Sequence, residues 1–212
     1  MSVDLSLDDL ERDALTEVVN IGVSRAAASL RKMVGRQVLL SVPAVEIVTR
    51  RAAASLIGQR ESEDLVSIHQ DFEGAFSGRA LLIFPETKSM ELVRSILGED
   101  VGPEDLPELE SEALAETGNV ILNNCLGTMA NMLQQSLKMS LPSVTRGNGD
   151  QIFARAGREG EDVALVLFLY INFTIQDRNI RGYIAMLMDL PSLSALKLLI
   201  ADFIDRVTAD AE

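Results

Sequence analysis

The chain has 212 residues, 47% of them hydrophobic, so it is long enough to bury a core in one or two domains. Its formal net charge of −13 disfavours binding to nucleic acid or to anionic lipid. The single cysteine, Cys125, excludes an internal disulfide, and neither a basic signal segment nor an apolar run of about 18 residues is present in the sequence. We therefore expect a cytoplasmic protein whose partner is another protein or a small molecule.

The predicted elements follow the order helix, strand, strand, strand, helix, and this order occurs twice. A first long helix is expected over residues 8–34, because Asp8 or Asp9 suits a helix N-terminus and Gly35 suits its end. The other elements of the first half are strands at 38–48, 65–72 and 79–84, a helix at 89–97 and a linker at 98–107. The second half is predicted to contain a helix at 108–137, a strand after 137 that carries Pro142, strands at 163–174 and 181–188, and a helix at 192–207.

The two halves are related by a repeat at a separation of 99 residues. Three residues of the first half recur at this separation, namely Glu17, Asn20 and Pro43 as Glu116, Asn119 and Pro142. The flanking residues agree in kind, since 41–45 reads SVPAV and 140–144 reads SLPSV. The sequence therefore predicts one domain over residues 1–212, made of two repeats at about 1–104 and 105–212.

The repeated Glu and Asn lie on the polar side of each long helix, because a helical residue advances by about 100°. The polar stripes consist of Asp13, Glu17, Asn20 and Ser24 in the first helix and Glu112, Glu116, Asn119 and Asn123 in the second. The opposite, apolar stripes consist of Leu15, Val19, Gly22, Ala26, Leu30 and Met33, and of Leu114, Gly118, Ile121, Cys125, Met129 and Met132. We expect the polar stripes to face outward and Cys125 to be a buried, unreactive core residue.

A solvated helix face does not by itself explain the repeated asparagine. Asparagine is a mediocre helix former, and Gln, Lys or Glu would serve an exposed face better. A proline inside a strand is tolerated at an edge or a bulge, so Pro43 and Pro142 mark such a place in each repeat. We interpret the paired Glu-x-x-Asn as retained chemistry.

The pattern Asp13-x3-Glu17-x2-Asn20-x22-Pro43 resembles the signature of the CheC, CheX and FliY chemotaxis phosphatases, and two copies at half-length spacing resemble CheC in particular. The resemblance implies an α+β fold, an internally duplicated pseudo-twofold domain with a central, mostly antiparallel sheet and the two motif helices side by side on one face. It also implies a phosphatase that accelerates hydrolysis of the aspartyl phosphate of a CheY-like response regulator in chemotaxis signalling.

The same resemblance implies a role for each motif residue. Glu17 and Glu116 would bind the lysine of the receiver's active site, while Asn20 and Asn119 would orient the attacking water. The supporting or docking residues would be Asp13, Ser24, Glu112 and Asn123, and the structural ones Pro43 and Pro142. We expect no metal or cofactor of the protein's own, because the receiver supplies Mg²⁺. Glu112 departs from the usual Asp or Ser, so the first site is expected to be slightly the better one.

The main alternative is a non-catalytic binding module that sequesters a phosphorylated receiver or a CheD-like partner. Affinity hot spots are rich in aromatic residues, whereas this chain has no Trp and two Tyr, which disfavours pure binding. The single histidine, His69, accompanies no nucleophile motif or Gly-rich phosphate loop, and we expect it to be structural. A CheD-like deamidase is a second partner that the resemblance suggests.

Overall fold

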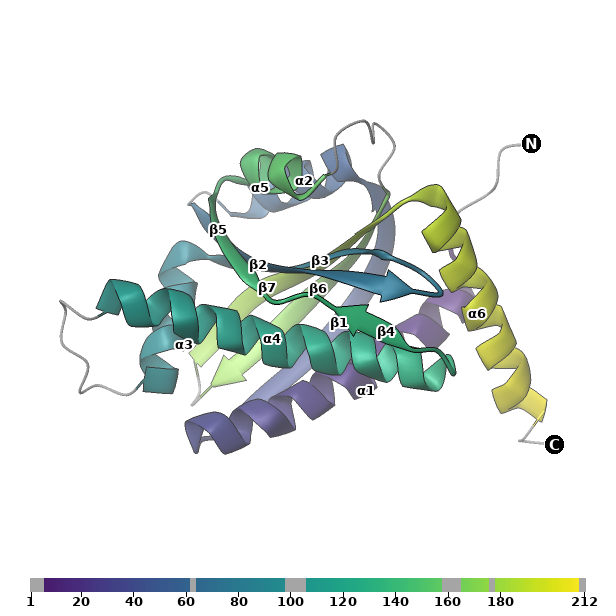
Figure 1. The fold of residues 1–212 in the computed structure, drawn as a ribbon, viewed down its shortest axis with the longest axis horizontal. Coiled ribbons are helices and arrows are strands. Elements are labelled where there is room, and N and C mark those ends of the chain that lie inside the picture. Colours follow the sequence, from purple (N-terminus) through teal and green to yellow (C-terminus); the bar gives the residue numbers. More distant parts are fainter. Residues whose placement is uncertain (1–5, 62–63, 98–105, 158–164, 176–177, 210–212) are drawn as a thin grey trace.

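A computed structural model describes residues 6–61, 64–97, 106–157, 165–175 and 178–209, and within them six helices and seven strands form (Figure 1). The helices are α1 (Asp9–Val34), α2 (Arg50–Arg60), α3 (Glu86–Leu97), α4 (Leu106–Met132), α5 (Gly149–Ala156) and α6 (Leu190–Ala209). The strands are β1 (Val38–Thr49), β2 (Leu65–Gly74), β3 (Gly78–Pro85), β4 (Leu137–Met139), β5 (Ser143–Gly147), β6 (Leu165–Ile175) and β7 (Arg178–Met188). The predicted linker falls mostly on 98–105, which lies outside the described residues.

Local signals fix both ends of α1 as predicted. Asp8 caps the helix, because its carboxylate accepts a hydrogen bond from Glu11 N at 2.8 Å and the Glu11 carboxylate accepts one from Asp8 N at 3.0 Å. Gly35 ends the helix in the left-handed conformation, with φ of 67°. The two caps leave one continuous helix on which the first motif is placed.

Three predictions about the elements were wrong. Two short helices, α2 and α5, were missed, one in each half. The second long helix ends at Met132 rather than at 137, because Gln134 adopts a left-handed φ of 55° and the chain turns into β4. The single strand expected around Pro142 is divided into β4 and β5, with the proline between them.

The strands form one antiparallel sheet in which strands from the two halves of the chain are interleaved. Its order is β1-β6-β7-β3-β2-β4, and β5 also pairs with β2. Each half therefore sends its first strand to the hairpin of the other half, since β1 pairs with β6 and both β4 and β5 pair with β2. The exchange brings residues of one repeat against the motif helix of the other.

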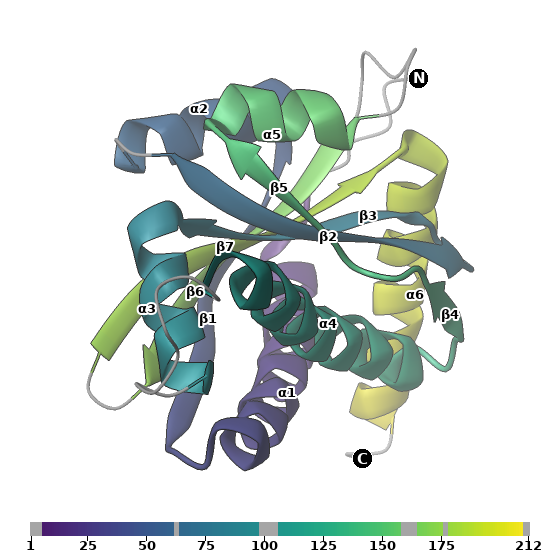
Figure 2. The same ribbon diagram turned by 60° about the vertical axis from the view of Figure 1, so that its left-hand side comes forward.

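Helices cover both faces of this sheet (Figures 1 and 2). The motif helices α1 and α4 lie side by side on one face, flanked by α3 and α6, and α2 and α5 pack together on the other. Each face has its own hydrophobic core, the larger one beneath α1 and α4. The predicted α+β fold with paired motif helices is confirmed. No helix within the described residues is long and apolar enough to span a membrane.

The apolar stripes of α1 and α4 are buried against the sheet and against each other, as predicted, with two exceptions at their ends. Met33, near the end of α1, is 39% exposed rather than part of the core, and Met132 is half-buried. Cys125 is completely buried, and burial raises the pKa of its thiol to about 12. The thiol is therefore protonated and enclosed, as expected of a core residue.

Candidate functional site

Each motif proline lies in a one-residue bulge at an outer strand of the sheet. Ser41 pairs with Asn172 and Ala44 with Tyr170, so three steps along β1 match two along β6. In the second half Met139 pairs with Phe72 and Ser143 with His69, so four steps match three along β2. The prediction that these prolines mark an edge or a bulge is confirmed. The extra residue of a bulge is not paired with the neighbouring strand, so the missing N–H of proline costs no hydrogen bond of the sheet.

Asn20 holds the first bulge in place directly. Its amino group donates to the carbonyls of Thr16 and Val42, at 3.0 Å each, and its Oδ1 accepts from Val42 N at 2.8 Å. Both hydrogens of the amino group are therefore used within the chain. The side chain is half-buried and turned toward β1, which corrects the expectation that it faces outward.

Asn119 is held differently, through its oxygen alone. Its Oδ1 accepts from Asn123 Nδ2 at 2.7 Å and from Gln70 Nε2 at 3.2 Å. Its own amino group has no hydrogen-bond partner among the described residues. The amino group is not fully buried either, so it reaches solvent. The two asparagines of the repeat are thus chemically unequal: Asn119 presents two open donors and Asn20 presents none.

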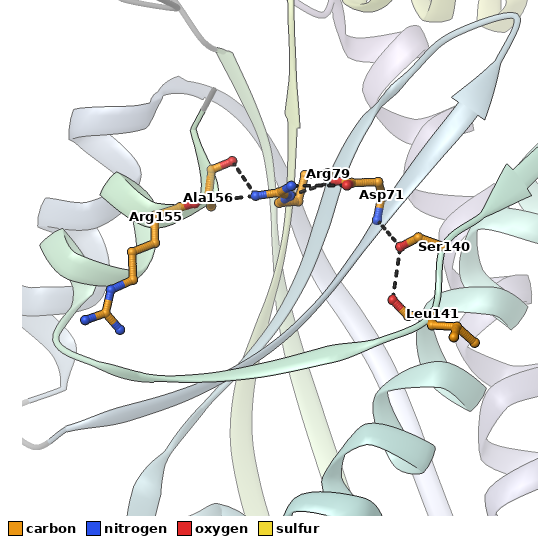
Figure 3. Close-up of polar contacts among 6 residues, drawn as sticks. All are labelled: Asp71, Arg79, Ser140, Leu141, Arg155 and Ala156. Atoms are coloured by element: carbon orange, nitrogen blue, oxygen red, sulfur yellow. Dashed lines mark hydrogen bonds and ion pairs between the residues drawn. The ribbon is translucent and has the colours of Figure 1, made fainter. Parts of the chain in front are cut away.

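The second bulge is held by side chains and backbone of β2. Gln70 Nε2 donates to the carbonyl of Ser140 at 2.9 Å. The Ser140 hydroxyl accepts from Asp71 N at 2.9 Å and donates to the Leu141 carbonyl at 3.0 Å (Figure 3). Arg79 in turn pairs with Asp71, Nε to Oδ1 at 2.7 Å, and reaches the C-terminal carbonyls of α5. The loop that carries the second motif proline is therefore fixed by the first repeat.

The two bulges also differ in the exposure of the residue before the proline. Val42, whose backbone Asn20 holds, is 2% exposed, whereas Leu141 at the equivalent place is 88% exposed. The second site therefore has an apolar side chain standing in solvent at its rim, and the first has none at that position.

The acidic residues of the motif are on the surface. Glu17 and Glu116 are exposed, each one helical turn before its asparagine, and so are Asp13, Ser24 and Glu112. Asn123 is half-buried because it supports Asn119, Pro43 is exposed and Pro142 is half-buried. Asp13 and Thr16 also line a cleft of about 510 Å³ with Pro43, beside the first motif. Each Glu can thus reach a partner protein.

Sequence reasoning missed Gln70, which belongs to the second site. It is 1% exposed and lies on β2, far in sequence from the helix that it supports. A glutamine in alternation with the apolar residues Val66, Ile68 and Phe72 was the available signal, because a buried amide must find hydrogen-bond partners. No spacing rule connects it to Asn119, since the contact depends on the exchange of strands between the halves.

The arrangement can bind a cation with its carboxylates and donate hydrogen bonds with the Asn119 amide. A carboxylate suits a lysine ammonium, and an amide with two open hydrogens suits a water oxygen or a phosphoryl oxygen. Within the described part of the chain no three His, Cys, Asp or Glu side chains are close enough to hold a metal ion. The site is a positioning surface for a group that a partner brings.

Two family models match the chain, each over one of the motifs. Residues 10–47, which contain Glu17, Asn20 and Pro43, match the CheC-like family, and residues 66–163, which contain Glu116, Asn119 and Pro142, match the chemotaxis phosphatase CheX. Both pairs of site residues therefore lie within segments that a chemotaxis family describes.

Comparisons over most of the chain also find chemotaxis phosphatases. The chain is 25% identical to the CheY-P phosphatase CheC of Bacillus subtilis over 92% of this chain and 96% of that protein. It is 26% identical to the flagellar motor switch phosphatase FliY of Bacillus subtilis over 65% of this chain, and spans 36% of that longer protein. The crystal structure of Thermotoga maritima FliY has the same fold, with a TM-score of 0.71 at 17% identity over 93% of this chain and 98% of the other. The chain is therefore similar, in the segments of both motifs, to the CheC, CheX and FliY chemotaxis phosphatases.

Proposed function

We propose that this protein accelerates hydrolysis of the aspartyl phosphate on a CheY-like response regulator in chemotaxis signalling. The observation that carries the proposal is the second motif helix, where an exposed Glu116 precedes by one turn an Asn119 whose amino group is open to solvent. The related CheC of Bacillus subtilis is a CheY-P phosphatase by name, and it matches this chain over nearly its whole length. The geometry of the second site and the similarity to this phosphatase both support hydrolysis of an aspartyl phosphate.

The reaction needs positioning more than covalent help. A water attacks phosphorus in line, the bond to the aspartyl oxygen breaks and the receiver's aspartate leaves as a carboxylate. Both protons of the water stay with the inorganic phosphate, which forms as H₂PO₄⁻. Asn119 can hold that water by donating to its oxygen, and its second hydrogen can meet a phosphoryl oxygen. A hundredfold acceleration corresponds to about 2.7 kcal/mol of transition-state stabilisation, which two oriented groups can supply.

The carboxylates dock the receiver. Glu116, and Glu17 on the neighbouring helix, accept a charge-assisted hydrogen bond from the lysine of the receiver's active site. The receiver also brings the Mg²⁺ that neutralises its phosphate, so the protein needs no metal or cofactor of its own. Glu112 and Asp13 add negative charge one turn before each Glu. The partner is a cytoplasmic receiver, and the protein acts in that compartment; a CheD-like deamidase stays a predicted second partner.

Phosphate release from a purified receiver tests the proposal. A CheY-like receiver, phosphorylated on its aspartate by a small phosphodonor with Mg²⁺ present, should lose phosphate at least tenfold faster with the protein than alone. Asn20→Ala combined with Asn119→Ala should abolish the acceleration while leaving binding largely intact. Asn124→Ala is the matched control, because within the described residues that α4 amide bonds only to the Val120 carbonyl of its own helix. It should retain full activity.

Single substitutions measure how much each of the two sites contributes to the acceleration of phosphate release. If Asn119→Ala removes most of the acceleration, the second site does the chemistry in this protein. If the wild-type protein binds the phosphorylated receiver but never speeds release, the sequestering module replaces the phosphatase as its function.

A further inference from the structure

We propose that Gln70 is a positioning residue that keeps the Asn119 amide in a reactive orientation. This inference rests on the proposed function. Gln70 comes from β2, in the first repeat, and Asn119 from α4, in the second. The second catalytic site is thus completed by a residue of the other half of the chain.

The contacts of Gln70 fix which end of the Asn119 amide faces solvent. Its amino group donates to the Ser140 carbonyl at 2.9 Å, which determines the orientation of the Gln70 amide. The same amino group donates to Asn119 Oδ1 at 3.2 Å, where Asn123 also donates. With two donors on its oxygen, Asn119 can face solvent only with its amino group.

The buried state of Gln70 argues that the arrangement is selected for more than packing. The side chain is 1% exposed, and its Oε1 is buried without a partner. An unsatisfied buried acceptor costs about 1–3 kcal/mol, and an aliphatic side chain of similar size would avoid that cost. Function accounts for the presence of Gln70 despite this cost, because its amino group donates to Asn119 Oδ1.

The first site has an aliphatic residue at the place that Gln70 occupies in the second site. Opposite the first bulge, between the paired Tyr170 and Asn172, β6 carries Ile171, which is 2% exposed. Gln70 occupies the equivalent place opposite the second bulge, between His69 and Asp71. With Ile171 there, Asn20 closes directly onto the Val42 backbone and uses both of its amino hydrogens. Gln70 separates Asn119 from Leu141 and prevents the same closure.

The second site is therefore the more active one, the reverse of the order expected from Glu112. Asn119 meets a receiver with two open donors, whereas Asn20 must first release Val42. The exposed Leu141 beside it gives the second site an apolar rim that the first site lacks.

Gln70→Ile tests the assignment by giving the second site the aliphatic residue that the first site has. With the phosphorylated CheY-like receiver and Mg²⁺, kcat should fall at least tenfold while KM changes less than twofold, because Glu116 and Leu141 still dock the receiver. Gln70→Glu keeps the size of the side chain but lacks the donor, and should show the same loss of kcat. Ile184→Val, in the core beneath the motif helices, is the control for a simple loss of stability. It should keep wild-type kcat.

A second measurement needs no receiver. The side-chain amide hydrogens of Asn119, assigned in ¹H–¹⁵N spectra by their loss in Asn119→Ala, should exchange with water at least tenfold faster than those of Asn20. In Gln70→Ile the Asn119 hydrogens should become as protected as those of Asn20. Equal exchange of the two asparagines in the wild-type protein overturns the inference, and so does a Gln70→Ile variant with unchanged kcat. If no receiver is dephosphorylated, the proposed function fails while amide exchange still decides the role of Gln70.

Discussion

Gly22 of α1 lies against the backbone of Cys125 of α4, so closely that a Cβ on Gly22 would stand 2.9 Å from Cys125 Cα and 3.2 Å from its carbonyl oxygen. Neither neighbour is a movable side-chain end, so the two helices can approach only because the residue is glycine. This contact sets the spacing of the two helices that carry the motifs.

Gly22→Ala should therefore destabilise the protein. Overpacking costs about 1–3 kcal/mol, and the better helix propensity of alanine offsets up to about 1 kcal/mol of it. A net loss of about 1–2 kcal/mol lowers Tm by roughly 2–8 °C in a chain of this size. Gly127→Ala is the control, because a Cβ there meets no atom within 4 Å, and it should raise Tm instead. Calorimetry measures the Tm of both variants. A Gly22→Ala protein at least as stable as wild type would contradict the close contact between Gly22 and Cys125.

Asn20→Ala should lower stability by about 2–3 kcal/mol. The substitution leaves the N–H and carbonyl of Val42 without their partners, and Val42 is 2% exposed, so water cannot easily replace them. Asn124→Ala removes a comparable amide that bonds only within its helix, and should be neutral or slightly stabilising. Denaturant unfolding curves measure both. Equal effects of the two substitutions would mean that the Asn20 contact with β1 contributes nothing to stability.

Local patterns predicted most of the fold. Asp8 and Gly35 fixed the ends of α1, and the alternation of apolar residues located the long strands within a few residues. The short helices α2 and α5 were missed because 11 and 8 residues give little periodicity. For α5 a signal was present, since Asn148 and Gln151 form a capping box.

The site residues were found by their repetition, but their orientation depended on the tertiary structure. On α1 alone, Asn20 belongs to the polar stripe, and only the bulge of β1, 22 residues later, turns it inward. Gln70 reaches Asn119 because β2 of the first half pairs with strands of the second. Helical periodicity therefore identifies the motif, whereas strand exchange decides which amide stays open.

His69 should make stability depend on pH near neutrality. Burial lowers its pKa from 6.5, the charge of Arg79 lowers it further, and Asp71 opposes both effects. The folded protein therefore holds neutral imidazole over a range in which the unfolded chain binds a proton. The free energy of unfolding should accordingly fall as pH drops below about 6.5, until the lower pKa of the folded state is reached.

His69→Gln should flatten this dependence between pH 7.5 and 5.5, a window above the ordinary titration of Asp and Glu. Ser67→Ala is the control, because Ser67 lies two residues earlier on the same side of β2 and does not titrate. Unfolding by urea at several pH values gives the slope for each protein. The control should follow wild type; if His69→Gln follows it too, the imidazole does not carry the pH dependence, and the groups responsible lie elsewhere in the chain.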